Sequence, residues 1–406
     1  MGKWIDTTLG CVVELKRGYD LPQQDRRLGT VPVVSSSGVS DHHAESMVKG
    51  PGVVTGRYGT LGQVFFIKED FWPLNTTLYV RDFKGNDPRF VSYFLRRVDF
   101  LAYSDKAAVP GINRNHLHQA QVRVPADAGE QRAIARILGT LDDKIELNRG
   151  ISETLEAMAR ALFRSWFVDF DPVRAKAQGR DPGLPKPLAD LFPSRLVDSE
   201  LGEIPEGWRT GPILEHARLM SGGTPKTDRS EYWEGSIAWA SAKDVSQSPG
   251  TFLVATERTI TERGLEESAT QMVPAFCSVV VARGATTGRM VLFGCDMAMN
   301  QTCYALASTT QTPFALYCRL RKEIDALVHA AHGSVFDTIT TSTFTSSRIV
   351  LPPKALLKAF EVRAEPLFLR VLESTHETRT LIALGDALLP KLISGDLRLA
   401  EFAHDA

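Results

Sequence analysis

The chain has 406 residues, a net charge of −1 and 43% hydrophobic residues, which is typical of a globular protein with two to three domains. The near-zero charge argues against a simple polybasic nucleic-acid binder, so any DNA contact has to come from local patches. The sequence contains no run of 18 apolar residues and no apolar signal-like stretch at its start, so we expect a cytoplasmic protein without a membrane span.

Residues 1–127 are predicted to form a mixed α/β domain. Apolar, β-rich runs at 53–54 and 64–66 flank the segment Arg57-Tyr58-Gly59-Thr60-Leu61-Gly62, whose two glycines indicate turns. The β pattern ends near Pro125, and a helical pattern begins at residue 128.

Residues 128–170 are predicted to form one long helix of roughly 40 residues, or about 60 Å. Its apolar residues recur with the 3-4 spacing of a coiled-coil seam, and the two middle positions of the seam are polar. The seam consists of Ile134, Leu138, Leu141, Ile145, Asn148, Ser152, Leu155, Ala159, Leu162 and Trp166.

Residues 171–203 are predicted to be a connector. Prolines recur through it, which rules out a continuous helix. One short helical turn is expected at 188–192. A connection this long is unusual within a compact domain, and its length suits a chain that must travel back to start a second one.

Residues 204–352 repeat the first domain, and residues 353–406 repeat the helix. Trp4 matches Trp208 at an offset of 204, whereas Arg57 matches Arg283 at an offset of 226. The second domain therefore carries about 22 additional residues between Trp208 and Arg283. Adding 226 to the first seam gives a second seam of Phe360, Ala364, Leu367, Val371, Ser374, Thr378, Leu381, Gly385, Leu388 and Leu392.

Two seams of equal length are expected to pack together. In an antiparallel pair the polar middles meet, so Asn148 and Ser152 would face Ser374 and Thr378; the alternative places these four at the edge of the seam. The predicted fold class is α+β: two mixed α/β domains joined by a pair of long antiparallel coiled-coil helices, with a pseudo-two-fold internal repeat. The domains would lie at opposite ends of the helix pair.

No catalytic or metal signature is present. The glycine-rich turns lack the Lys of a P-loop, no GxSxG occurs, and no amino-methyltransferase tetrapeptide is found. The five cysteines match no zinc spacing and are expected to be buried, reduced thiols. His42-His43 and His116-x-His118 lack suitably spaced acidic or cysteine partners. We therefore expect no catalytic residue, no metal and no cofactor in this chain.

Polar residues able to contact DNA recur at the same place in both domains. Arg pairs with guanine, Asn and Gln pair with adenine, and Thr and Tyr reach phosphates or a thymine methyl group. Some polar residues at these places are expected to be turn or capping residues instead, above all Asn75 and Asn300, which match each other at an offset of 225. The candidates are Ser36, Arg57, Tyr58, Thr60, Asn113 and Arg114 in the first domain, and Lys226, Lys243, Arg283, Thr286, Thr287, Arg289 and Gln301 in the second.

The order of these segments resembles the specificity (S) subunits of Type I restriction–modification enzymes. The resemblance is carried by residues 201–208, Ser221-Gly222-Gly223-Thr224-Pro225, the Trp-containing stretches at 232–239, and residues 162–170 at the end of the first helix. The first domain departs from the pattern, with Arg17-Gly18-Tyr19-Asp20 in place of the glycine-rich loop. That departure suggests that the two domains read different sequences.

The resemblance implies a DNA-binding subunit without catalytic residues of its own. Each target-recognition domain would read one half of a bipartite, asymmetric double-stranded DNA target. The helices would set the spacing and dock two methyltransferase (M) subunits, which use S-adenosylmethionine to methylate adenine N6 and must extrude that base. ATP-dependent restriction (R) subunits would complete a nuclease.

Two other interpretations remain open. The chain could be the recognition subunit of a Type IIG- or IIB-like system, or a coiled-coil scaffold whose domains bind protein instead of DNA. A stand-alone methyltransferase is disfavoured because its motifs are missing.

Overall fold

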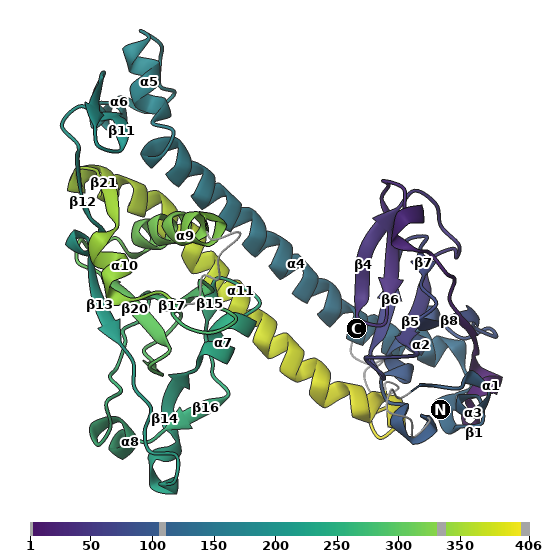
Figure 1. Cartoon of the computed structure of the whole chain (residues 1–406). Helices are drawn as coiled ribbons and strands as arrows, with labels where there is room; N and C mark the ends of the chain where they lie inside the picture. The colour runs from purple at the N-terminus through teal and green to yellow at the C-terminus, as the bar shows by residue number, and fades with distance from the viewer. Residues whose placement is uncertain (1–2, 105–110, 331–337, 399–406) are drawn as a thin grey trace, which may run out of the picture. The chain divides into compact units, whose positions relative to one another are not determined.

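The computed structural model describes residues 3–104, 111–330 and 338–398 (Figure 1). Its contacts divide the chain into two compact units, one formed by Met1–Ile145 with Thr380–Ala406 and the other by Glu146–Arg379. We call them unit 1 and unit 2. The long helices α4 (Ala128–Phe167) and α11 (Lys354–Ser394) contribute residues to both units. Residues 3–127 are called head 1, and residues 204–352 head 2.

Head 1 contains two small sheets and a closing pair of strands. The sheet orders are β2-β8-β5-β6 and β4-β3-β7, and β1 pairs with β9. All five residues of β5 are buried, because this strand lies between β8 and β6. The elements are β1 (Trp4–Thr8), α1 (Leu9–Val12), β2 (Glu14–Arg17), η1 (Gln23–Asp25), β3 (Val31–Ser35), β4 (Gly38–His43), β5 (Gly52–Gly56), β6 (Val64–Ile67), β7 (Trp72–Pro73), β8 (Thr77–Asp82), α2 (Pro88–Leu95), η2 (Leu101–Tyr103), α3 (Arg114–Leu117) and β9 (Gln121–Pro125).

Head 2 repeats this plan with one more strand. Its sheets have the orders β13-β20-β17-β18-β15 and β16-β14-β19, and β12 pairs with β21. The elements are β12 (Arg209–Pro212), η3 (Ile213–Glu215), β13 (Ala217–Ser221), η4 (Ser230–Tyr232), β14 (Trp233–Ala240), α7 (Ala242–Gln247), β15 (Phe252–Leu253), β16 (Arg258–Ile260), α8 (Glu262–Glu266), β17 (Ser278–Val281), β18 (Met290–Phe293), β19 (Ala298–Met299), β20 (Cys303–Ser308), α9 (Pro313–Ala330), α10 (Thr341–Ser346) and β21 (Arg348–Leu351).

The additional residues of head 2 lie where the changing offset predicts. Both heads contain a parallel strand pair, Val33 with Trp72 in head 1 and Trp239 with Ala298 in head 2. Between Trp239 and β17, head 2 inserts α7, β15 and α8 around β16. Strand β15 pairs in parallel with β18 and becomes the fifth strand of the sheet. The insertion thus enlarges one edge of head 2 and leaves the shared strands in place.

Helices α4 and α11 pair antiparallel within each unit, which confirms the expected direction. In unit 2 the rings of Phe163 and Phe360 lie 5.6 Å apart, and the Asn148 amide donates to the Thr378 hydroxyl at 3.5 Å. In unit 1 the Leu141 side chain packs against Gly385. Every seam residue named above is buried or half-buried. Asn148 is 1% exposed, so the polar layer lies inside the pair and not at its edge.

Each head is held by the start of one long helix and the end of the other. In head 2 the Trp208 ring lies 6.0 Å from Phe167 and 5.6 Å from Phe170, both at the end of α4. In head 1, Leu392 and Ile393 of α11 join the apolar core, and Gly395 packs against the Trp4 ring. Unit 1 is therefore assembled from the two ends of the chain.

The connector contains more structure than its prolines suggest. Helix α5 (Asp171–Ala177) follows α4 after a left-handed residue at Phe170, and α6 (Lys186–Ala189) starts two residues before the expected helical turn. Strands β10 (Leu196–Ser199) and β11 (Gly202–Pro205) form a hairpin that the sequence analysis missed, and the predicted boundary at residue 204 falls within β11. The last part of the predicted segment 353–406, residues 399–406, lies outside the described residues.

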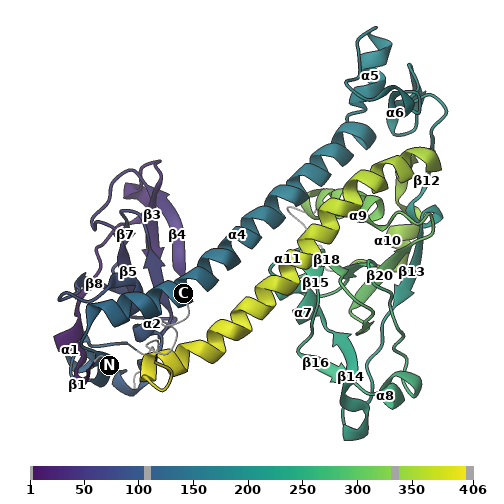
Figure 2. The same cartoon turned by 180° about the vertical axis from the view of Figure 1, so that it is seen from behind.

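A buried carboxylate of α11 caps the start of α9. Glu361 Oε1 accepts from the Phe314 backbone N–H and Oε2 accepts from that of Ala315, both at 3.0 Å. The stacked rings of Phe314 and Phe368, with centroids 4.7 Å apart, join the same two helices, which lie side by side in both views (Figures 1 and 2). Burial raises the pKa of Glu361 to about 7, although the two backbone bonds oppose the shift.

Unit 2 is therefore expected to lose stability as the pH rises from about 4.5 to 7. In this window the unfolded chain releases the Glu361 proton and the folded chain retains it, so folding loses up to about 3 kcal/mol. Urea unfolding across this pH range measures the slope. Glu361→Gln does not titrate and should remove that part of the pH dependence. An unchanged slope in Glu361→Gln would contradict the assignment.

Candidate nucleic-acid interface

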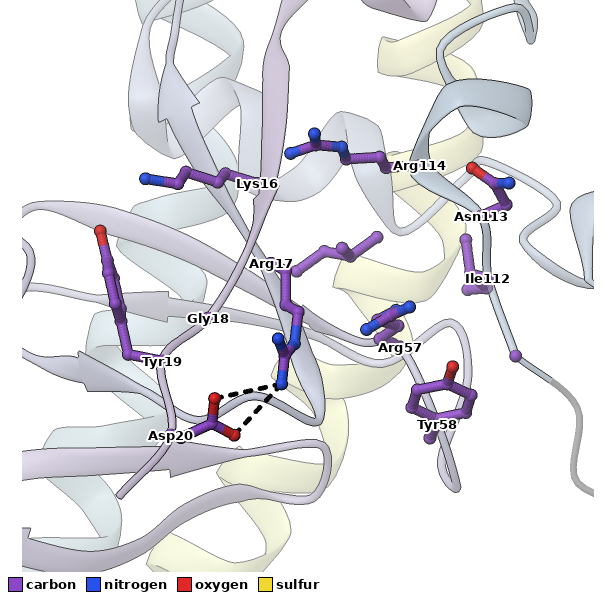
Figure 3. A pocket seen from close by; sticks show the side chains of 12 residues that line it. Lys16, Arg17, Gly18, Tyr19, Asp20, Arg57, Tyr58, Ile112, Asn113 and Arg114 are labelled. Atoms are coloured by element: carbon purple, nitrogen blue, oxygen red, sulfur yellow. Dashed lines mark hydrogen bonds and ion pairs between the residues drawn. The ribbon is translucent and has the colours of Figure 1, made fainter.

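Head 1 contains an open cavity of about 590 Å³ at the end of its first sheet (Figure 3). Figure 3 shows that Arg17, Arg57 and Arg114 approach this space from three different segments. The lining residues are Lys16, Arg17, Gly18, Tyr19, Asp20, Arg57, Tyr58, Leu78, Gly111, Ile112, Asn113 and Arg114.

Backbone hydrogen bonds hold these segments together. The Arg57 N–H donates to the Thr76 carbonyl at 2.9 Å, and the Ile112 N–H donates to the Arg57 carbonyl at 3.1 Å. The Asn113 side chain accepts from the Asn115 N–H and caps α3, so Arg114 stands at the first position of that helix. These hydrogen bonds fix the backbone of the cavity wall. We call this hydrogen-bonded backbone the frame.

Most of the charge in this cavity is positive and uncompensated. Arg17 pairs with Asp20 at 3.1 Å. Lys16, Arg57 and Arg114 have no carboxylate within 4 Å among the described residues. The Arg57 guanidinium lies 4.8 Å from the centroid of the Tyr58 ring, which leaves its charge available to an anion. Such a surface attracts phosphate groups.

Two tyrosines lie beside this surface, Tyr19 in the cavity lining and Tyr79 buried next to it. The hydroxyls of Tyr19 and Tyr79 are 3.0 Å apart, and the Lys16 ammonium lies 5.4 Å from the Tyr19 ring. The hydrogen bond with Tyr79 and the nearby Lys16 lower the pKa of Tyr19, while burial raises that of Tyr79. Tyr79 therefore stays neutral at neutral pH, and its buried hydroxyl is paired with that of Tyr19.

The structure brings together the six candidates of head 1. Arg57, Tyr58, Asn113 and Arg114 line the cavity. Ser36 lies beside Gly59, and the Thr60 carbonyl packs against Gly56 in the same loop. The sequence analysis missed Lys16 in this group, and it noted Arg17 only as part of an unusual loop. The pairing of β2 with β8 brings both to the site.

Head 2 repeats the same backbone frame. The Ala282 N–H donates to the Thr302 carbonyl and the Ile339 N–H donates to the Ala282 carbonyl, each at 2.8 Å. These bonds make Ala282 the counterpart of Arg57. The match of Arg57 with Arg283 was therefore wrong by one residue: Arg283 corresponds to Tyr58, and each forms a bridge to the following segment. The loop of head 2 is one residue longer, which hid the true register.

The same comparison corrects the match of Asn75 with Asn300. Thr76 and Thr302 are equivalent by their hydrogen bonds, so Asn75 corresponds to Gln301. In head 1 the Asn75 amide donates to Asp20, and in head 2 the Thr224 hydroxyl donates to Gln301. Asp20 and Thr224 also occupy equivalent positions. In both heads a side-chain hydrogen bond therefore joins the loop after β2 or β13 to the turn before β8 or β20, but the side chains differ.

The remaining candidates of head 2 are more dispersed. Arg283, Thr286 and Thr287 lie in the loop between β17 and β18, where the Thr287 hydroxyl donates to the Gly284 carbonyl. Arg289 lines a second cavity of about 220 Å³ with Arg160 and Arg321.

Two candidate lysines of head 2 lie outside this loop. Lys243 forms an ion pair with Glu257 at 2.6 Å, and the Lys226 carbonyl accepts from the Trp233 indole. Their contact with DNA stays a prediction.

The described residues contain no group of three or more His, Cys, Asp or Glu placed to hold a metal ion, and none of their helices is long and apolar enough to cross a membrane. All five cysteines are free. Cys277, Cys303 and Cys318 are buried as expected, whereas Cys11 and Cys295 are exposed, which corrects the expectation for those two.

Comparison with known proteins points to one family. The family model described as "Type I restriction modification DNA specificity domain" matches residues 1–157 and 205–356. The chain is 27% identical to the HindI specificity subunit of Haemophilus influenzae, over 73% of each chain. It is 24% identical to the MjaIX specificity subunit of Methanocaldococcus jannaschii, over 87% of this chain and 79% of that one.

A solved structure shares the fold. It is the S subunit of a Type I restriction–modification system from M. genitalium, with a TM-score of 0.64 and 14% identity, covering 97% of this chain and 96% of the other. The likeness supports the arrangement of elements described above.

Proposed function

Because the chain belongs to the Type I restriction–modification DNA specificity family, we propose that it gives such an enzyme its DNA target, with each head reading one half of a split duplex sequence. One observation supports this proposal most directly. The two heads repeat one hydrogen-bonded frame and present different polar side chains on it. A shared frame suits the same kind of ligand, and unlike side chains suit unlike base sequences.

Exchanging head 2 tests this proposal. Replacing residues 208–351 by the corresponding segment of another family member is expected to change one half of the methylated target and leave the other half unchanged, because each frame is complete within its own unit. Methylome sequencing of a host that carries the gene with its partner methyltransferase gene reads both halves. A change in both halves would show that the heads are not independent readers.

The long helices are proposed to dock the two M subunits and to set the spacing between the half-sites. Both helices carry apolar side chains that the pairing leaves exposed, Leu147 and Met158 on α4 and Val362 and Ile382 on α11, between 43% and 68% exposed. Contiguous exposed apolar surface marks protein contact sites, and we propose that these side chains belong to such a surface. The catalytic steps, with S-adenosylmethionine and ATP as cofactors, are assigned to the M and R subunits.

Met158→Glu and Val362→Glu are expected to weaken M-subunit binding at least tenfold, because each places a charge in an apolar contact. Titration of the purified chain with M subunit measures the effect. Leu28→Glu is the matched control, since Leu28 is fully exposed and belongs to neither long helix. Equal binding by all three variants would exclude these side chains from the docking surface.

A further inference from the structure

The shared frame allows the side chains of the two heads to be compared position by position. Pairing of β2 with β8 and of β13 with β20 matches Lys16 with Met220 and Arg17 with Ser221. Helices α3 and α10 each begin one residue after a capping position, which matches Arg114 with Thr341. The equivalent pairs around the cavity are Lys16 and Met220, Arg17 and Ser221, Tyr19 and Gly223, Arg57 and Ala282, Tyr58 and Arg283, and Arg114 and Thr341.

These pairs differ in charge more than in any other property. Head 1 places four cations at these positions and offsets one of them with Asp20. Among the described residues of head 2, the same positions hold one cation, Arg283, together with small or apolar side chains. Met220 is also buried, at 8% exposed, so it adds nothing to the surface. The unequal charge is thus a property of the side chains and not of the backbone.

We propose that head 1 is the electrostatic anchor on DNA and that head 2 reads its half-site mainly through neutral hydrogen-bonding groups. This inference rests on the proposed function. Each cation that neutralises a phosphate releases condensed counterions, and the logarithm of the binding constant then falls with the logarithm of salt concentration by roughly 0.9 per contact. Lys16, Arg57 and Arg114 are each available for such a contact, so most of the salt dependence should belong to head 1.

The second cavity of head 2 is the rival source of phosphate contact. It gathers Arg160 of α4, Arg289 and Arg321, but it also contains Glu156. Arg321 lies 3.6 Å from Asp325, which offsets its charge further. The second cavity therefore has two carboxylates, Glu156 and Asp325, near its three cations. The cavity of head 1 has one carboxylate, Asp20, near four cations. This balance favours head 1 as the anchor.

The test compares salt series for the complex of the full chain with its M subunits on a duplex containing the methylated target. Lys16→Gln/Arg57→Gln/Arg114→Gln is expected to reduce the slope of log K against log salt by roughly 2.7. Arg283→Gln, and the triple change of Arg160, Arg289 and Arg321 to Gln, should each reduce it by about 0.9 or less. Arg263→Gln is the control, because Arg263 on α8 pairs with Glu267 at 2.8 Å.

The converse test adds cations to head 2. It is informative because a steeper salt dependence cannot result from loss of folding. Ala282→Arg/Thr341→Arg places cations of head 1 on the frame of head 2 and should raise the slope by up to about 1.8. Unchanged melting temperatures establish that each variant is folded. Phosphate contacts carry no sequence information, so the triple Gln variant of head 1 should weaken binding to the target and to an unrelated duplex by similar factors. A loss of preference for the target would instead identify base contacts and contradict the anchor role, whereas the Arg263→Gln control should leave the methylated target unchanged.

The outcomes separate this inference from the proposed function. If the unmodified complex binds the duplex with a steep slope and the head 2 changes reduce that slope as much as the head 1 changes, the anchor role of head 1 is wrong and the proposed function stands. If the unmodified complex does not bind duplex DNA in a salt-dependent way, the proposed function itself fails, and a scaffold role is favoured.

Discussion

Phe360→Ala is expected to lower the free energy of unfolding of unit 2 by about 3–5 kcal/mol, the usual cost of emptying the space of a large buried aromatic ring. Phe360 is fully buried, and its ring lies 5.6 Å from Phe163, 6.1 Å from Trp166 and 5.6 Å from Phe167. These three residues form the last turns of α4. The substitution therefore removes the contact that joins α11 to the end of the other long helix.

Hydrogen exchange of the α4 and α9 amides, together with denaturant unfolding, measures this loss. Leu369→Ala is the matched control on the same helix, because Leu369 is 40% exposed and should cost under about 1 kcal/mol. Similar losses for the two variants would mean that the aromatic cluster is not what secures the helix end.

A methyl group at Gly18 or Gly222 is expected to destabilise its head by roughly 3 kcal/mol and to remove DNA contact from that head alone. A Cβ atom at Gly222 would lie 2.1 Å from the Asn300 carbonyl oxygen, and one at Gly18 would lie 2.2 Å from that of Leu74. Both neighbours are backbone atoms of the frame, so the strand end has to move. The loop that follows would lose its tie to Asn75 or Gln301.

Footprinting of the M-subunit complex should show protection of only one half-site for Gly18→Ala and of the other for Gly222→Ala. Gly250→Ala is the control in head 2, since no atom lies within 4 Å of its Cβ position. Full protection of both half-sites, with stability unchanged, would contradict the shared role of the two glycines.

The helices were predictable because their pattern is local and occurs twice. The 3-4 spacing fixes which face of each helix is apolar, and the polar pair at the middle of both seams fixes the register. Asn148 meets Thr378 as that register requires. Nothing beyond the sequence of each helix was needed for this part of the fold.

The cavity of head 1 was only partly predictable, because its walls come from segments far apart in the sequence. Arg57, Tyr58, Asn113 and Arg114 lie in turn-like stretches that signal exposure. Lys16 lies within a strand, and only its pairing opposite Tyr79 brings it to the site. The one-residue error at Arg283 has a similar origin, since loop length is decided by hydrogen bonds between strands, which the sequence does not display.

The way unit 1 is closed has a consequence for protein synthesis. Unit 2 is continuous from Glu146 to Arg379, so all of its residues are made before the part of α11 that belongs to unit 1. Head 1 precedes unit 2 in the chain, but Leu392, Ile393 and Gly395, which complete its core and cover Trp4, follow unit 2. The usual order, in which the N-terminal domain finishes folding first, is therefore reversed. On the ribosome, the apolar surface of head 1 that Leu392 and Ile393 cover therefore stays open until unit 2 has been made, and chaperones bind exposed apolar surface of this kind.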